Sequence, residues 1–425
     1  MKNIFAALTL LICISVSAQH AYKRALFIGN SYTYVNDLPQ MVANVAASAG
    51  DTLFFDSNSI GGYTFQQHSV NATTLSKIAA GNWDYVVLQE QSQYLSFPIG
   101  QVEADVFPYA KKLDSIINAN NPCAETVFFM TWGRKNGDAD NCAVWPPVCT
   151  YQGMDSLLSL RYRMMAESND AILSPVGAVW HYLRQNYPAI ELYNADESHP
   201  SVAGSYAAAC SFYAVLFRKD PSMITFVSTL NATDAENIRN AVKIIVYDSL
   251  MNWHVGEYDP AANFSYSVSG ENQITFSNNS SYASSYLWDF GDGDTSTTVN
   301  PIHNYANTGS YTVTLVAADC GIADTSTFEI NVIPMGIAQQ MDARQLSWRI
   351  YPNPATAVVL IEINDAGDFY YRISSLTGSE IERGAINSKD NQVDISSFAD
   401  GFYIFQLYCG QNLTGHEKLI KISGQ

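Results

Sequence analysis

Arg24-Ala25-Leu26-Phe27-Ile28-Gly29 is a short apolar run that ends at a glycine, and Asn30 and Ser31 follow it directly. A run of this length is typical of a strand buried on both faces of a sheet. Gly29 tolerates the sharp turn that ends the strand. The pattern predicts that Ser31 lies at the carboxyl end of a first strand, where ligands bind in open α/β sheets. A serine that only caps a turn is the alternative.

Further along the chain, short apolar runs alternate with longer segments whose apolar residues recur at helical spacing. Residues 84–88 and 126–130 predict two more buried strands, and residues 38–49, 155–168 and 202–217 predict helices. Strands that alternate with helices are typical of a parallel sheet covered on both faces. The sequence therefore predicts an α/β fold for this part of the chain.

Composition and the N-terminus favour an exported globular protein. The 425 residues allow two or three domains, and 47% hydrophobic residues suffice for packed cores. A net charge of −18 argues against nucleic acid and anionic membranes as partners. Lys2, the apolar residues 4–16 and the small residues 16–18 predict a signal peptide over residues 1–18. We expect no transmembrane segment, because no other stretch has the necessary apolar length.

Cysteine positions fit an oxidising compartment, where disulfides persist. Cys142 and Cys149 lie close together in the sequence, which favours a bridge that staples one loop. Cys210 lies in an apolar helical segment, which favours a buried free thiol. The cysteine count does not fix the remaining pairing.

Composition and motifs divide the chain into five segments. We expect a signal peptide at 1–18, an α/β domain at 19–258, a β-sandwich at 259–335, a linker at 336–346 and a second β-rich domain at 347–425.

The segment 259–335 alternates strand-like residues with Asn, Ser, Gly and Asp turns, which predicts a small β-sandwich. Its centre, Trp288-Asp289-Phe290-Gly291-Asp292-Gly293, resembles the signature of the polycystic-kidney-disease (PKD) domain. The resemblance implies a spacer or a weak contact with carbohydrate or protein. Asp289, Asp292 and Asp294 are candidate cation ligands, but a tight Asp-Gly turn is favoured.

The segment 347–425 contains Ile350-Tyr351-Pro352-Asn353-Pro354, then Asp400-Gly401-Phe402-Tyr403, and ends near Lys418-Leu419-Ile420-Lys421-Ile422. This order resembles the C-terminal sorting domain of the type IX secretion system of Bacteroidetes-type bacteria. The resemblance implies the secretion machinery as a partner and export across the outer membrane, with release or attachment at the cell surface. The chemistry is therefore expected in residues 19–258.

Asp196 and His199 are the candidate acid–base pair. An acid three residues before a histidine can orient the imidazole from within one loop, and a nucleophilic serine needs such a base. Ser31 is the candidate nucleophile. Gly62 and Gln91 lie between them in the chain, and a backbone N–H and an amide can stabilise an oxyanion. The combination predicts acyl transfer.

In this order the residues resemble the SGNH, or GDSL-like, hydrolase family. Gly29-Asn30-Ser31 fills its Gly-Asp-Ser block, with Asn30 in place of the aspartate, and Asp196 and His199 match its Asp-x-x-His block. The resemblance implies a flavodoxin-like three-layer parallel sheet and a catalytic Ser31, Asp196 and His199.

The two middle blocks fit the family less closely. Gly62 best fits the isolated glycine, with Gly61 as the alternative. Residues 89–92 read Gln-Glu-Gln-Ser where the family has Gly-x-Asn-Asp. Gln91 then replaces the asparagine, and Gln89 is its alternative. The resemblance implies an oxyanion hole in which the N–H of the nucleophile joins Gly62 and Gln91.

The loop after the third predicted strand supplies the candidate substrate-binding residues. Trp132 can stack on a sugar ring, and Arg134 can meet an acidic substituent. The alternative is that Trp132 packs the loop and that the cation is solvated.

Other titratable residues fit worse as a reaction centre. For His68 a packing role is favoured, and His181 has no acid nearby. Glu90 lacks a partner for a glycosidase pair. No cluster has metal-ligand spacing, and no phosphate loop is present, so we expect neither a metal nor a cofactor.

These observations predict a secreted serine esterase that removes acetyl or similar acyl groups, with an acylated polysaccharide or small molecule as substrate. A lipase or lysophospholipase is an alternative, and it would need an apolar rim around Ser31. A non-catalytic carbohydrate-binding surface protein is a second alternative, motivated by the altered third block.

Overall fold

The computed structural model describes residues 20–270, 272–332, 348–363, 369–375, 380–386, 391–409 and 412–422. The predicted signal peptide and the predicted linker lie outside these described residues.

The first part of the chain contains a five-stranded parallel sheet with the order β2-β1-β3-β4-β5. This order is flavodoxin-like and confirms the predicted α/β fold class. The strands are β1 (Tyr22–Gly29), β2 (Thr52–Ser59), β3 (Tyr85–Leu88), β4 (Glu125–Phe129) and β5 (Ile172–Ser174).

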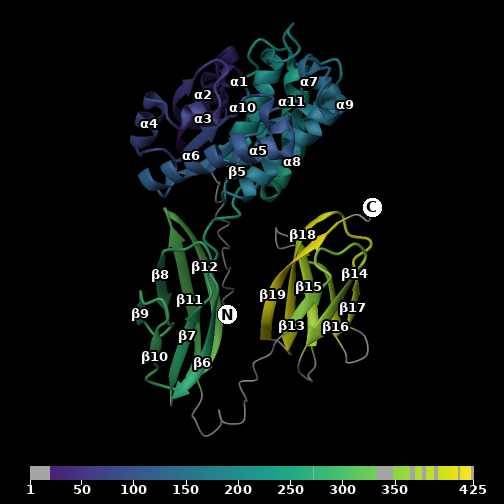
Figure 1. Ribbon diagram of the computed structural model, residues 1–425. Helices are drawn as coiled ribbons and strands as arrows, with labels where there is room; N and C mark the ends of the chain where they lie inside the picture. The colour runs from purple at the N-terminus through teal and green to yellow at the C-terminus, as the bar shows by residue number, and fades with distance from the viewer. Residues whose placement is uncertain are drawn as a thin grey trace, which may run out of the picture. The chain divides into compact units, whose positions relative to one another are not determined.

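Helices surround this sheet, as the purple to teal part of Figure 1 shows. They are α1 (Ser31–Tyr34), α2 (Leu38–Ser48), α3 (Phe65–His68), α4 (Ala72–Ala79), α5 (Ile99–Asp105), α6 (Phe107–Asn120), α7 (Ala139–Cys142), α8 (Tyr151–Glu167), α9 (Val176–Asn186), α10 (Val202–Phe217) and α11 (Ala232–Ile245).

Strand β1 runs through the centre of the core. Residues 25–28 are fully buried, and Phe27 packs edge-to-face on Phe212 of α10. The strand ends at Gly29, and this position requires a glycine because there is no room for a side chain. A Cβ atom there would lie 2.3 Å from Thr33 Oγ1 and 2.7 Å from Gln89 Oε1. The glycine thus lets the first helix turn back tightly against β3, which places Ser31 over the carboxyl end of the sheet.

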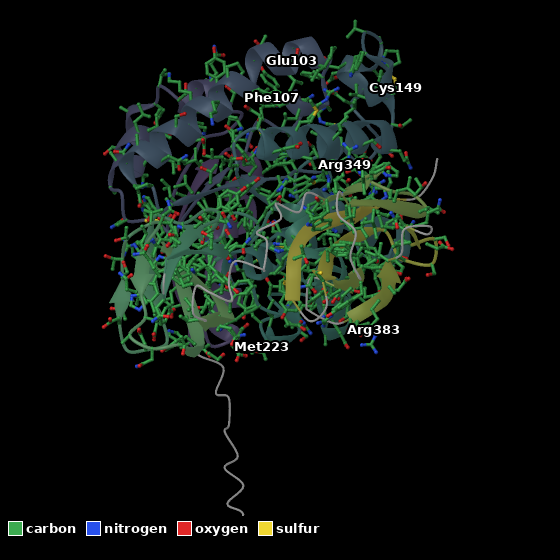
Figure 2. All side chains as sticks on the ribbon, turned by 90° about the horizontal axis from the view of Figure 1, so that it is seen from below. Glu103, Phe107, Cys149, Met223, Arg349 and Arg383 are labelled. Atoms are coloured by element: carbon green, nitrogen blue, oxygen red, sulfur yellow. A yellow bond between two sulfur atoms is a disulfide. The ribbon has the colours of Figure 1, made fainter. Side chains whose placement is uncertain are left out.

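Two disulfides are formed among the described residues. Cys149, labelled in Figure 2, is bonded to Cys142 as expected. Cys123 is bonded to Cys320, a pairing that the sequence left open. Cys210 is fully buried and free, and burial raises the pKa of its thiol to about 12, so it is an inert packing residue.

The next part of the chain forms two antiparallel sheets with the orders β10-β7-β6 and β12-β11-β8-β9. Trp288 is fully buried against Phe264 and Phe276. The Asp289 carboxylate accepts the Gly291 N–H, so this acid is used in the predicted tight turn. The strands are β6 (Phe264–Gly270), β7 (Gln273–Asn278), β8 (Ser285–Asp289), β9 (Thr295–Ser296), β10 (Ile302–Asn304), β11 (Gly309–Asp319) and β12 (Ile322–Val332).

The C-terminal part also forms two antiparallel sheets, β13-β14-β17 and β16-β15-β18-β19, with a core of its own. Its strands are β13 (Trp348–Tyr351), β14 (Val358–Ile363), β15 (Phe369–Ser375), β16 (Glu380–Ile386), β17 (Gln392–Asp394), β18 (Gly401–Cys409) and β19 (Asn412–Lys421). Within the described residues, no helix has the length and apolarity needed to cross a membrane.

Candidate active site

Ser31, His199 and Asp196 form a continuous hydrogen-bonded chain at the carboxyl end of the sheet. Ser31 is the first residue of α1, and its Oγ lies 2.8 Å from His199 Nε2. His199 Nδ1 contacts Asp196 Oδ2. Because a carboxylate can only accept, Nδ1 carries the proton and Nε2 is free to accept the Ser31 hydroxyl hydrogen. This tautomer is the one that a general base for serine requires.

The hydrogen bonds of Asp196 keep its carboxylate charged and oriented to hold that tautomer. Its Oδ1 accepts the backbone N–H groups of Ser198 and His199 at 3.1 and 2.9 Å. Partial burial acts to raise the pKa of Asp196, but these bonds and the His199 ring outweigh it and hold the pKa below its usual value. The carboxylate therefore stays charged throughout the neutral pH range.

The loop that carries the acid and the base is fastened to the core by aromatic residues. Tyr32 stacks on Trp132 with ring centroids 4.8 Å apart, and Trp132 stacks on Trp180 at 3.7 Å. The indole of Trp132 donates to the Ser198 carbonyl at 3.1 Å, and the Tyr32 hydroxyl bonds Ser198 Oγ at 2.7 Å. These bonds hold the residue before His199 from two sides.

The expected contact between Trp132 and a sugar ring is wrong in this structure, because Trp132 is fully buried. Both faces of its indole are already stacked on other rings. The structure instead agrees with the alternative, in which Trp132 packs inside the protein. Its side chain supports the loop that carries His199.

Arg134 does reach the cleft, which is lined by Asn30, Ser31, Tyr32, Gly62, Gln91, Ser92, Arg134, Ser198 and His199. Its Nη1 pairs with Asp138 at 3.0 Å and Asp140 at 3.7 Å. Two carboxylates thus neutralise this cation, which weakens the case for an acidic substituent on the substrate.

Ser31 and Gly62 are the available backbone donors. Gly62 has φ of +72°, a conformation that favours glycine, and it lines the cleft, whereas Gly61 does not. Neither the Ser31 nor the Gly62 N–H has an acceptor among the residues that the structure describes. Both can therefore receive a ligand oxygen.

Gln91 lines the same cleft, but its amide is partly engaged. Its Oε1 accepts the Gln93 N–H at 2.8 Å, and its Nε2 donates to Gln93 Oε1 at 3.0 Å, which leaves one N–H of the amide. The alternative, Gln89, is fully buried behind the site. Its Oε1 accepts from the Asn30 N–H and from Thr33 Oγ1, so it has a structural role.

Asn30 stands where the Gly-Asp-Ser block of the SGNH family has an aspartate, and it uses the amide that an aspartate lacks. Its Nδ2 donates to the carbonyls of Tyr63 at 3.0 Å and Glu90 at 3.4 Å, and its Oδ1 accepts the Tyr32 N–H. It therefore ties the end of β1 to the segments that follow β2 and β3.

We expect Asn30→Asp to be more damaging than Asn30→Ala. The aspartate places a buried carboxylate oxygen against two carbonyl oxygens, whereas alanine only removes the bonds. Leaving the carbonyls of Tyr63 and Glu90 unpaired costs about 1–3 kcal/mol each. The free energy of unfolding of Asn30→Asp should therefore fall by about 2 kcal/mol or more. Chemical denaturation of both variants measures this loss. Equal stability of Asn30→Asp and the wild type would contradict the role assigned to the amide.

The other candidate bases lie elsewhere. His68 is fully buried, with Nε2 bonded to the Gly29 carbonyl and Nδ1 to Thr74, and burial lowers its pKa, so it is a neutral packing residue. The expectation that His181 has no acid nearby is wrong, since its Nδ1 lies 2.8 Å from Asp155 Oδ2. The two residues are 26 positions apart on different helices, a contact that sequence spacing does not reveal. They line a separate cavity from that of Ser31.

Family models match both β-rich segments. Residues 259–332 match the PKD domain, and residues 349–422 match the secretion system C-terminal sorting domain. Both identities agree with the resemblances in the sequence. The sorting domain indicates export, either to the cell surface or into the medium.

A curated relative, the collagenase ColQ1 of Bacillus cereus (strain Q1), is 66% identical over 35 residues, which are 8% of this chain and 4% of that protein. The chain spans no more than 8% of the length of the curated relatives that it matches.

Solved structures similar to this chain include a protein assigned as an SGNH hydrolase and an esterase. A DUF4886 family protein from Bacteroides uniformis has a TM-score of 0.47 at 15% identity and covers 54% of this chain and 95% of its own. A protein assigned as an SGNH hydrolase from Slackia heliotrinireducens has a TM-score of 0.38 at 26% identity, with 45% and 97% covered. The psychrotrophic esterase EstA from Pseudoalteromonas sp. has a TM-score of 0.34 at 11% identity, with 46% and 97% covered.

Proposed function

We propose that this protein is a secreted serine esterase that hydrolyses short acyl esters, acetyl esters above all, on carbohydrate. The observation that carries the proposal is the 2.8 Å contact between Ser31 Oγ and His199 Nε2, with Asp196 on the other ring nitrogen. The SGNH-like fold and the sorting domain support a secreted hydrolase.

In the proposed reaction, His199 Nε2 takes the hydroxyl proton of Ser31 as Oγ attacks the ester carbonyl. The Ser31 and Gly62 N–H groups, with the remaining amide N–H of Gln91, stabilise the oxyanion. His199 then protonates the leaving alcohol, and the acyl group stays on Ser31. Water, deprotonated by His199, attacks the acyl-enzyme and releases the acid, while Ser31 Oγ takes the proton back from His199. Asp196 stabilises the imidazolium in both halves of the cycle.

The size and lining of the cleft support a short acyl group. Its volume is about 260 Å³, and among its lining residues there is no aliphatic side chain. A long acyl chain gains about 0.8 kcal/mol per buried CH₂ only where apolar walls exclude water. A lipase would need such apolar walls, and no aliphatic side chain among the lining residues provides them. Export and the PKD domain favour a carbohydrate carrier, whereas the burial of Trp132 removes one argument for it.

We expect kcat/KM to be at least tenfold higher for p-nitrophenyl acetate than for p-nitrophenyl octanoate, because no aliphatic side chain lines the cleft to bury the longer chain. Initial rates over a series from acetate to octanoate measure this preference. Acetate release from an acetylated polysaccharide, compared with the same polymer deacetylated beforehand, tests the carbohydrate carrier. A rate that rises with chain length would support the lipase alternative instead.

A further inference from the structure

Glu90 is a fully buried acid at the carboxyl end of β3, directly behind the cleft. It is the residue that stands between the two glutamines of the altered third block. Burial raises the pKa of Glu90 to about 8, while its hydrogen bonds from Phe65 and Gln91 act to lower it. Burying a carboxyl group away from water costs free energy unless hydrogen bonds compensate for the lost water contacts.

The carboxyl group of Glu90 joins two segments that are 25 residues apart. Its Oε2 accepts the Phe65 N–H at 3.0 Å, and its Oε1 accepts the Gln91 N–H at 2.6 Å and shares the Phe65 N–H at 3.2 Å. Phe65 is the first residue of α3, so its N–H has no acceptor within the helix. Glu90, two residues after the end of β3, supplies that acceptor.

The segment that Glu90 holds is the one that presents Gly62. Asn30 Nδ2 holds the Tyr63 carbonyl, and Glu90 holds the Phe65 N–H, so the chain directly after Gly62 is fixed at two points. The same carboxyl group fixes the backbone of Gln91. No hydrogen bond of Glu90 is to Ser31 or His199 among the described contacts.

We propose that Glu90 is a positioning residue of the oxyanion hole, because its carboxyl group locks the backbones that carry Gly62 and Gln91 at a fixed distance from Ser31. This proposal rests on the proposed function. An oxyanion hole stabilises the transition state only when its donors are held in advance, since donors that must move lose free energy at each turnover. The role explains why an acid, rather than an apolar residue, occupies this buried position.

The test is Glu90→Gln. The glutamine keeps one oxygen acceptor, but its NH₂ group takes the place either of Oε2, 3.0 Å from the Phe65 nitrogen, or of Oε1, 2.6 Å from the Gln91 nitrogen. Two donors then face each other, and one segment is displaced. We expect kcat, counted per active site by the burst of p-nitrophenol, to fall about 10–100-fold, with KM within about twofold, because only transition-state contacts are lost. Affinity for an aryl trifluoromethyl ketone, to which Ser31 adds to give a tetrahedral oxyanion, should fall by the same factor. Glu90→Ala should lose more than Glu90→Gln.

Asp114→Asn is the matched control. Asp114 of α6 has a buried carboxyl group that accepts a hydrogen bond from Thr126 Oγ1. Thr126 lies at the amino end of β4, away from the cleft. The loss of the Asp114 carboxyl group should lower stability but leave kcat per active site unchanged. If Glu90→Gln also keeps its kcat and its ketone affinity, the positioning role is wrong. If Ser31→Ala is as active as the wild type, the proposed function itself is wrong. Should both Glu90 variants fail to fold, amide exchange in the wild type decides: rapid exchange at Phe65 and Gln91 would overturn the proposal.

Discussion

Ser31→Ala is expected to lower kcat for p-nitrophenyl acetate by about 10⁵-fold, the largest effect of any single change in this chain. The reason is that alanine leaves no atom to form the acyl-enzyme, while His199, Asp196 and the backbone donors remain. A residual rate above that in water should persist, since oriented donors still polarise the bound ester. KM should change little, because the hydroxyl contributes mainly to the transition state.

The measurement needs two readouts. Hydrolysis of the acetate ester gives kcat, and covalent labelling with a fluorophosphonate reports the nucleophile directly. Ser156→Ala is the matched control, since Ser156 is an exposed residue of α8 that lines the separate cavity near His181. It should keep both the rate and the label. Labelling of Ser31→Ala to the wild-type extent would identify another nucleophile and remove the basis of the mechanism.

The strands that the sequence reveals are the buried ones. Residues 25–28, 86–88 and 127–129 have almost no exposed surface, so their apolar runs are continuous. The strand β2 lies at the edge of the sheet and exposes part of nearly every residue, so it has no such run. The strand β5 is three residues long, too short for any period to appear. The central strands could therefore be predicted, and the edges could not.

The candidate site shows the same limit. Asp196 and His199 are close in sequence, and a local motif predicts their contact. The bonds that hold the site in place join residues far apart, such as Trp132 to Ser198 and Phe65 to Glu90. Nothing in the spacing of these residues indicates that they meet. An exposed Trp132 and a buried one are equally compatible with a loop after β4, and only the packing of Tyr32 and Trp180 on its two faces decides between them.

Asp196→Asn is expected to lower kcat by about 10⁴-fold without disturbing the fold. Asp196 Oδ1 accepts two backbone N–H groups, from Ser198 and His199. The asparagine oxygen has to keep those bonds, so its NH₂ group turns toward His199 Nδ1. That nitrogen must then accept, which moves the ring proton to Nε2. An imidazole with a proton on Nε2 cannot take the proton of Ser31.

Glu197→Gln separates this tautomer effect from the loss of a charge in the same loop. The Glu197 carboxylate accepts only from the exposed Asn136 Nδ2 among its described bonds, so its removal leaves His199 untouched. We expect kcat within about twofold of the wild type, since exposed charges contribute little. Asp196→Ala should be less harmful than Asp196→Asn, or equally so, because alanine does not force the wrong tautomer. A loss for Glu197→Gln as large as that for Asp196→Asn would mean that the charge of the loop, and not the orientation of the His199 ring, controls the rate.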